Sequence, residues 1–409
     1  MVWNAHDPQG NETGKITWEL VRWTRGRGLD VGCGAHKGFP HFIGVDNGKD
    51  IGLFRQQFKP DVWIDDAGKL DMFASNSLDF VYSSHMLEHV PHEDVVKTLK
   101  EWWRVIKTNG YLVLYLPDET LYPKVGEPGA NPDHKWNVSA KKMFDLMEKV
   151  GDWECRENQL RDGGTEYSLF QVYQKRSPNH GHIHSWSGPR PKKKAAVIRY
   201  GAFGDILQAS SVFAGLKAQG YHVTVYCSPP GSDVIKHDPN VDDLYLQDKD
   251  QVPNQHLELF WEHHKAKYDK WVNLCESAEG TLLSIPGRVL HRLPPSLREQ
   301  LTAVNYLEMQ HRMADVPHKP KVKFFPTKEE RIWAEGQRKH ANEILVCWAL
   351  AGSSVHKAWP WVDAVMADLL LRYGDRITIV MMGGPDAVLL EQGWFKVGED
   401  GMPLKTEHG

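Results

Sequence analysis

The amino-acid sequence predicts an α/β protein built from parallel sheets with helices on both faces. Short apolar, β-rich runs recur at residues 28–32, 42–46, 78–84 and 111–117, and again at 195–201, 222–228, 270–276, 343–350 and 376–384. Helical patterns lie between such runs, as at 92–107, where apolar residues follow the period of a helix. Because buried strands that alternate with amphipathic helices form parallel sheets covered on both faces, we expect two α/β parts, the second itself two-lobed.

Length and composition narrow the possible classes of protein. A chain of 409 residues is long enough for two to three domains. Lys and Arg number 49 and Asp and Glu 53, and the net charge of −4 argues against nucleic-acid binding by bulk charge. No apolar run approaches the roughly 18 residues of a membrane span, and no apolar signal segment is visible at the N-terminus. The five cysteines are scattered without a CxxC pair, so we expect no disulfide framework and a cytoplasmic protein.

One segment is predicted to be an exposed linker. Residues 176–194 combine Pro, Gly and Ser with three histidines and five basic residues, and they contain no acid. Such a composition has neither a helical nor a strand period. The histidines could bind a metal, but the entropy lost in ordering a flexible segment disfavours this. The predicted domains are therefore 1–175, 195–325 and 326–409.

A glycine loop follows the first predicted strand. The strand runs into Gly32 and Gly34, and the next strand ends in Asp46. Glycines let the backbone approach a ligand closely, and a carboxylate at the tip of the neighbouring strand can accept both hydroxyls of a ribose. This arrangement is typical of nucleotide binding, although a plain tight turn and a helix cap are the alternatives for these residues.

The segments around this loop carry a family resemblance. They are LDVGCG (29–34), GVD (44–46), LDFVYSSHMLEHV (78–90) and RVIKTNGYL (104–112). With these segments in this order, residues 25–175 resemble the class I S-adenosylmethionine-dependent methyltransferases. The resemblance implies a Rossmann-like fold and S-adenosyl-L-methionine as the cofactor.

The resemblance also assigns roles to single residues. It implies a cofactor-binding set that consists of Asp30, Gly32, Gly34, Asp46 and Asp66. Within this set the two glycines flank the methionine part of the cofactor, and Asp46 holds its ribose. Asp66 meets the adenine amino group, and its neighbour Asp65 is an alternative for that role.

Histidines are the candidates on the side of the methyl acceptor. An oxygen acceptor gives up a proton during methyl transfer, so a nearby histidine or carboxylate is useful. We expect His85 to face the methyl group as the catalytic base and His89 and His134 to bind the substrate, although a structural role for His85 is the alternative. HMLEH (85–89) also matches an inverted zinc-protease pattern. That pattern lies at a strand-to-helix turn and lacks an evident distal ligand, so we expect no metal.

The second half carries a different resemblance. Residues 195–220 read as strand, glycine loop and helix, with Asp205 at the start of the helix, where a carboxylate is often only a cap. Over about 195–390 the chain resembles heptosyltransferase-type glycosyltransferases of the GT-B fold. This resemblance implies a nucleotide-sugar donor, no metal and Asp205 as the general base. It also implies a diphosphate cradle formed by Ser353, Ser354 and Lys357. Relative to that family, we expect the second lobe to be incomplete.

Together these features predict a bifunctional transferase. It would move a methyl group from S-adenosylmethionine and a sugar from a nucleotide-sugar in the modification of a glycan or glycoconjugate. The alternative is a methyltransferase of a nucleobase or small metabolite whose second half is inactive and only holds a carbohydrate or nucleotide. The sequence indicates no oligomeric state.

Overall fold

The chain forms two compact units. The computed structural model describes residues 12–48, 60–184, 193–276, 293–339, 342–349, 361–383, 395–397 and 403–405. The first unit comprises residues 1–201 and 205–322, and the second comprises 202–204 and 323–409. Within the described ranges, no helix has both the length and the apolar character needed to cross a membrane.

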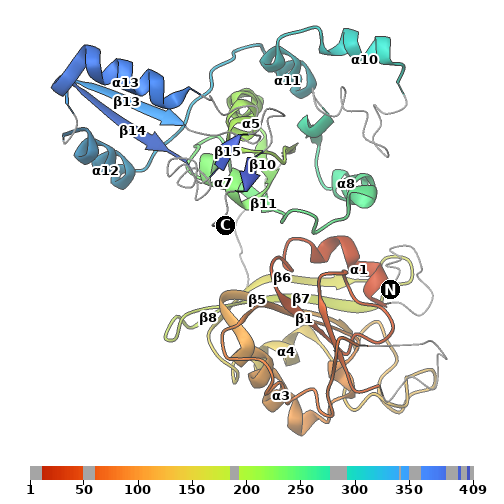
Figure 1. Cartoon of the computed structure of the whole chain (residues 1–409). Coiled ribbons are helices and arrows are strands. Elements are labelled where there is room, and N and C mark those ends of the chain that lie inside the picture. The colour runs from red at the N-terminus through yellow and green to blue at the C-terminus, as the bar shows by residue number, and fades with distance from the viewer. Residues whose placement is uncertain are drawn as a thin grey trace. The chain divides into compact units, whose positions relative to one another are not determined.

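An eight-stranded sheet forms the N-terminal part of the first unit (Figure 1). Its strands are β1 (Gly28–Val31), β2 (Ile43–Asp46), β3 (Val62–Trp63), β4 (Leu78–Ser84), β5 (Ile106–Pro117), β6 (Trp153–Arg161), β7 (Ser168–Lys175) and β8 (His182–Ile183). They are ordered β3-β2-β1-β4-β5-β7-β6-β8. Strands β1 to β5 pair in parallel, whereas β7 is antiparallel to both of its neighbours. The strand order reverses between β1 and β4, and such a switch point is where open α/β sheets bind ligands.

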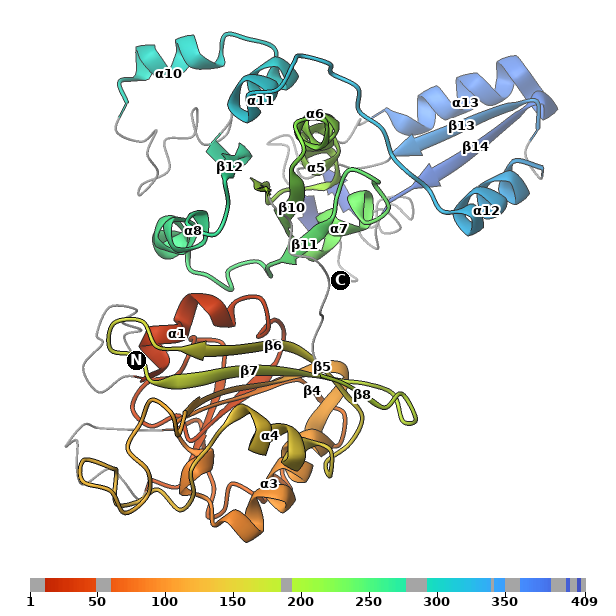
Figure 2. The ribbon, with the colours of Figure 1, turned by 180° about the vertical axis from the view of Figure 1, so that it is seen from behind.

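Helices cover both faces of this sheet. They are α1 (Glu12–Leu20), η1 (Leu87–His89), α3 (His92–Val105) and α4 (Ala140–Met147). Figure 2 shows α3 and α4 on one side of the sheet and α1 on the other. Successive residues of β5 alternate between two cores, with Leu112 and Leu114 on the α3 side and Val113 and Tyr115 on the α1 side. The α/β prediction for this part of the chain is therefore confirmed.

A second sheet follows in the same unit. Its four strands are β9 (Lys194–Ile198), β10 (His222–Cys227), β11 (Asp243–Leu246) and β12 (Lys270–Asn273). All pair in parallel in the order β11-β10-β9-β12. The helical segments are α5 (Phe203–Ala209), η2 (Ser210–Val212), α6 (Phe213–Ala218), α7 (Pro229–Ile235), η3 (Asn254–His256), α8 (Leu257–Lys265), η4 (Leu274–Glu276), α10 (Pro295–Thr302) and α11 (Tyr306–Ala314). Buried residues of α5 and α6 pack on one face of this sheet.

The two sheets share one apolar core, which we call the shared core. It joins residues of α1, of the α1 side of the first sheet, of the second sheet and of α8. Polar contacts reinforce it: Arg22 donates to both carboxylate oxygens of Asp243 at 3.1 Å, and Nε2 of Gln251 donates to the Val21 carbonyl at 2.7 Å. The sequence pattern did not predict this union.

The segment predicted to be a linker is only partly described. Residues 182–183, which lie inside it, form β8 and pair in parallel with β6. Residues 185–192 lie outside the described residues. Its last residue, Lys194, is the first residue of β9.

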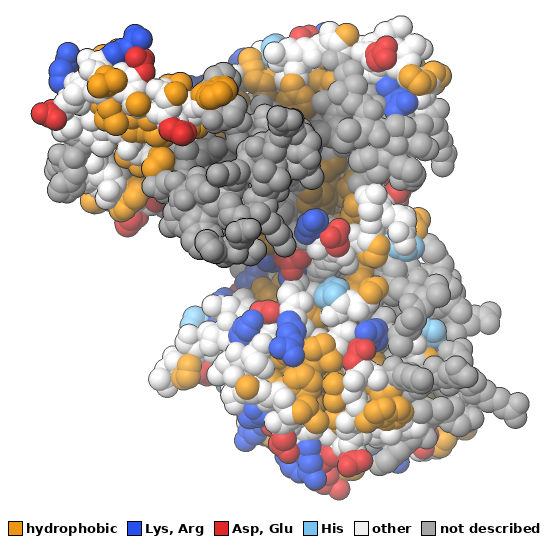
Figure 3. Space-filling model, viewed as in Figure 1, with side chains coloured by type: hydrophobic (Ala, Val, Ile, Leu, Met, Phe, Trp, Pro, Cys, Tyr) orange, Lys and Arg blue, Asp and Glu red, His pale blue; other side chains and the backbone are white. Residues whose placement is uncertain are grey.

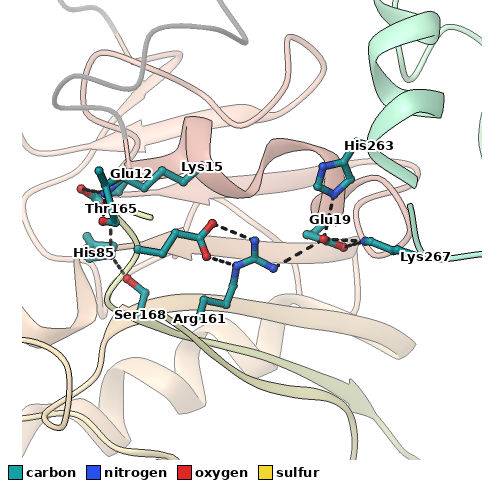
Figure 4. Close-up of polar contacts among 10 residues, drawn as sticks. Glu12, Lys15, Glu19, His85, Arg161, Thr165, Ser168, His263 and Lys267 are labelled. Carbon is teal, nitrogen blue, oxygen red and sulfur yellow. Dashed lines mark hydrogen bonds and ion pairs between the residues drawn. The ribbon is translucent and has the colours of Figure 1, made fainter. Parts of the chain in front are cut away.

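Glu19 is the centre of a charged cluster at the junction of α1 and α8 (Figure 4). His263 Nε2 lies 3.0 Å and Lys267 Nζ 2.6 Å from its Oε1 atom, and Arg161 approaches the same oxygen at 3.6 Å. Burial opposes ionisation of Glu19, but the hydrogen bond of His263 and the charge of Lys267 hold the pKa of this carboxyl well below its usual range. Folding therefore favours the ionised form of Glu19.

We expect this cluster to make the free energy of unfolding depend on pH in the acidic range. A depressed folded-state pKa stabilises the protein above the ordinary glutamate pKa of 4.5, and this contribution is lost as the pH falls below it. Glu19→Gln should flatten the fall in the free energy of unfolding between about pH 5 and pH 3, measured by urea denaturation. Glu262→Gln, which changes an exposed carboxylate on α8, is the control and should keep the wild-type slope. If the free energy of unfolding falls equally steeply with pH in wild type and in Glu19→Gln, Glu19 is not the group responsible.

The second unit contains a small parallel sheet. Its elements are α12 (Lys328–Lys339), β13 (Ile344–Ala349), α13 (Val362–Tyr373), η7 (Gly374–Arg376), β14 (Ile377–Met382), β15 (Phe395–Val397) and β16 (Pro403–Lys405). Strands β13 and β14 pair in parallel, and β15 and β16 pair in antiparallel. Figure 3 shows hydrophobic side chains on the surface over α13, where Leu370 and Leu371 are exposed. None of the described residues of α13 is buried.

Candidate active site

The loop after β1 requires glycine. Gly32 has a φ of 75° and Gly34 a φ of 51°, a region that residues with side chains rarely adopt. A Cβ atom on Gly32 would lie 2.7 Å from Cβ of Met86, whereas one on Gly34 would meet no atom of the described residues within 4 Å. The amide of Gly32 donates to the Val45 carbonyl at 2.8 Å. The loop therefore crosses from β1 to the end of β2.

Asp46, at the end of β2, is hydrogen-bonded to this loop. Its Oδ2 accepts a hydrogen bond from the Gly34 amide at 3.0 Å, and its Oδ1 accepts one from the Gly48 amide at 2.8 Å. Both contacts lie at the carboxyl edge of the sheet, beside the switch point between β1 and β4. The carboxylate thus has a fixed orientation before any ligand arrives.

The other two predicted cofactor carboxylates differ in environment. Asp30 is buried under the loop, where its Oδ2 accepts from the Gly38 amide at 2.8 Å. Burial raises the pKa of Asp30 to about 7, against the hydrogen bond of Gly38 and the charge of Lys37. Asp66 follows β3 and accepts from the Gly68 amide at 2.8 Å. Asp30 is therefore held by the backbone of the loop, and Asp66 is half-buried after β3.

His85 stands directly after β4 in a strained conformation. Its φ is 47°, its Nε2 lies 2.8 Å from the Ser168 hydroxyl, and its Nδ1 lies 3.8 Å from Oε1 of Glu88. Glu12 flanks the ring at 3.7 Å (Figure 4). Burial, reinforced by the charge of Lys15, lowers the pKa of His85 to about 3, so the ring is neutral near pH 7. The ring is therefore oriented by Ser168 and flanked by two carboxyl groups.

Glu88 and His134 meet beside His85. Glu88 is fully buried, and burial raises its pKa to about 8. His134 places Nε2 at 3.7 Å from Oε1 of Glu88, and burial lowers the pKa of His134 to about 4. The ring of His89 meets that of His134 edge-on, with centroids 4.9 Å apart.

The grouping of Glu88, His89 and His134 differs from the one that HMLEH (85–89) suggests, in which His85 and His89 share one face of a helix. Because His85 has a positive φ and lies before η1, it does not stand one helical turn from His89. The histidine whose ring contacts that of His89 is His134, which lies 45 residues further along the chain. The sequence pattern identified His89 and His134 separately, but only the fold brings them to one carboxylate.

Asp205 lies in the first turn of α5, close to the end of β9. Its Oδ1 accepts from Nη2 of Arg199, a buried side chain, at 2.8 Å. A Cβ atom on Gly201 would lie 2.7 Å from Cβ of Asp205, so the glycine permits this close approach. The three residues predicted to cradle a diphosphate, Ser353, Ser354 and Lys357, lie outside the described residues.

Comparison with known families concerns the first sheet and its loop. Residues 29–114 match the family model described as a methyltransferase domain. The matched range begins in β1 and ends in β5, so it contains the glycine loop, Asp46 and the turn that carries His85. No curated protein matches the chain.

Many solved structures are similar to part of the chain, and two of them are described below. An S-adenosylmethionine-dependent methyltransferase from Archaeoglobus fulgidus is 20% identical, with 40% of this chain and 94% of that chain covered and a TM-score of 0.30. The 1,6-didemethyltoxoflavin-N1-methyltransferase of Burkholderia thailandensis, solved with S-adenosylhomocysteine, is 12% identical, with 42% and 82% covered and a TM-score of 0.31. The family match shows that the N-terminal part of this chain contains a methyltransferase domain of the α/β, Rossmann-like kind.

Proposed function

We propose that the protein transfers the methyl group of S-adenosylmethionine to an oxygen atom of a small molecule or glycan. The observation that carries the cofactor part of this proposal is the hydrogen bond from the Gly34 amide to Asp46 at the switch point of the first sheet. It supports a ligand with a ribose, because a fixed carboxylate beside a glycine turn can accept two hydroxyl hydrogen bonds there. Among the described residues, no atom lies within 4 Å of where a Cβ atom on Gly34 would stand, which supports room for the rest of the cofactor.

Three carboxylates and the glycine loop after β1 form the proposed cofactor site. Asp46 accepts the ribose hydroxyls, and the half-buried Asp66 accepts the adenine amino group, with Asp65 as its alternative. Gly32 and Gly34 leave room for the methionine part, while Asp30 holds the loop from below through the Gly38 amide. When bound, S-adenosylmethionine supplies an electrophilic methyl group.

The acceptor side of the proposal uses the histidines after β4. His85 is the proposed acceptor of the proton that leaves the substrate hydroxyl, and His89 and His134 are proposed to contact the substrate. The side chain of His85 is positioned by Ser168, whose hydroxyl lies 2.8 Å from Nε2. A base held within reach of a reacting hydroxyl contributes about 10²–10⁴-fold to the rate of such transfers.

Asp46→Ala tests the cofactor site. We expect the free energy of binding of S-adenosylmethionine, measured by isothermal titration calorimetry, to weaken by about 2–3 kcal/mol, because two charge-assisted hydrogen bonds are lost. Asp145→Ala, which removes an exposed carboxylate from α4, is the control and should bind as wild type does. No saturable heat from wild type, or an unchanged affinity in Asp46→Ala, would overturn the proposal.

We also propose sugar transfer from a nucleotide-sugar at the second sheet, with Asp205 as the general base. In support, the Asp205 carboxylate is partly exposed near the end of β9, an inner strand, and is oriented by Arg199. Ligands of parallel sheets bind at that edge. Ser353, Ser354 and Lys357 are proposed to hold the diphosphate of the donor. In this proposal residues 195–325 and 326–409 are the two lobes, and a glycan is the shared substrate.

A further inference from the structure

Glu88 is a carboxyl group buried just after β4. It has no exposed surface, and neither of its carboxylate oxygens is hydrogen-bonded among the residues that the structure describes. A buried polar group without a partner destabilises a fold, by more when the group is charged. An external ligand for this carboxylate would remove that cost.

Besides His85, whose Nδ1 lies 3.8 Å from Oε1 of Glu88, two further histidines lie near this carboxylate. Nε2 of His134 lies 3.7 Å from Oε1 of Glu88, and one ligand atom from each of Glu88, His89 and His134 lies within 4.8 Å of the others. Ligand atoms on one tetrahedral ion are about 3.4 Å apart when the bonds are about 2.1 Å long. The three groups therefore need only small side-chain movements to share one ion.

The backbone fixes these side chains from two segments. The Lys135 amide donates to the Glu88 carbonyl at 2.8 Å, and Nε1 of Trp136 donates to the Leu87 carbonyl at 3.2 Å. These bonds hold the segment of His134 against η1, which carries Glu88 and His89. The site is therefore largely formed by the fold itself.

We propose that Glu88, His89 and His134 bind a divalent transition-metal ion, with Zn²⁺ as the best match. Two imidazoles and one carboxylate suit zinc and its first-row neighbours, whereas Mg²⁺ and Ca²⁺ prefer oxygen ligands alone. Three protein ligands leave a fourth position for water or a substrate oxygen. The site shares His89 and His134 with the proposed substrate side, but binding of the ion can be measured without any methyl transfer. It differs from the sequence-based expectation of no metal.

Metal binding to the full-length chain tests this proposal directly. After treatment with a chelator, the protein should take up one Zn²⁺ per chain in a competition titration with a chromophoric chelator. Glu88→Gln and His134→Asn should each weaken binding by at least about 100-fold, since even residues behind metal ligands are worth 10–100-fold. His182→Ala is the matched control, because it removes a histidine from the histidine-rich segment 176–194, and it should bind as wild type does.

Wild-type protein decides the outcome if a variant does not fold. Co²⁺ should give the visible absorption of a four-coordinate ion with nitrogen and oxygen ligands, and Zn²⁺ should raise the Tm as any ligand of the native state does. Absence of both effects would overturn the proposal. So would Zn²⁺ binding that His182→Ala abolishes while Glu88→Gln and His134→Asn retain it.

Discussion

Phe260→Ala lowers the free energy of unfolding of the first unit by about 3–5 kcal/mol, the usual cost of removing a buried phenylalanine. Phe260 is fully buried in α8, and its ring centroid lies 6.1 Å from that of Trp18 and 6.0 Å from that of Tyr245. Trp18 belongs to α1 and Tyr245 to β11, so the cavity opens between the two sheets. Urea denaturation followed by tryptophan fluorescence measures the loss.

The matched control is Leu259→Ala on the same helix. Leu259 is 38% exposed, so its truncation should change stability by only about 0.5 kcal/mol. Hydrogen exchange gives a second readout, because a shared core predicts that Phe260→Ala reduces protection in β5 as well as in β9. Loss of protection confined to β9–β12 would show that the sheets are stabilised separately.

Asp205→Asn reduces the proposed sugar transfer by about 10²–10⁴-fold, the usual contribution of a general base. The measurement is the release of nucleoside diphosphate from a panel of nucleotide-sugars. Because Asp205 pairs with the buried Arg199, the substitution also replaces an ion pair by a neutral hydrogen bond and should cost about 1–3 kcal/mol of stability. The assay is therefore run well below the Tm of the variant.

Asp233→Asn is the control for this substitution. Asp233 is an exposed residue of α7 that pairs with Lys236, and its change should leave sugar transfer intact. If Asp205→Asn keeps more than about half of the wild-type rate while its stability falls, Asp205 orients Arg199 and is not the base.

Local patterns in the sequence predicted much of the first sheet. The runs at 28–32, 42–46, 78–84 and 111–117 correspond to β1, β2, β4 and β5, because alternating burial and β-rich composition are properties of single strands. The glycine loop was also predictable, since Gly32 and Gly34 adopt backbone angles that favour this residue.

Contacts between distant segments were not predictable in the same way. The approach of His134 to Glu88 depends on the Trp136 and Lys135 hydrogen bonds to η1, which no local pattern encodes. The shared core likewise depends on which faces of two sheets meet. Alternation along β5 tells that Val113 and Tyr115 share a face, but it does not tell what covers that face.

The shared core has a consequence for synthesis of the chain on the ribosome. Gln251 bonds Val21 across 230 residues, and α8 follows β7 by roughly 80 residues. At the usual rate of 5–20 residues per second, the α1 side of the first sheet stays uncovered for about 4–16 seconds after its last long strand has emerged. During that interval aromatic residues such as Phe170 and Tyr115 lack their final neighbours. The nascent chain is thus most prone to aggregate between completion of β7 and arrival of α8, and it is there that a chaperone would act.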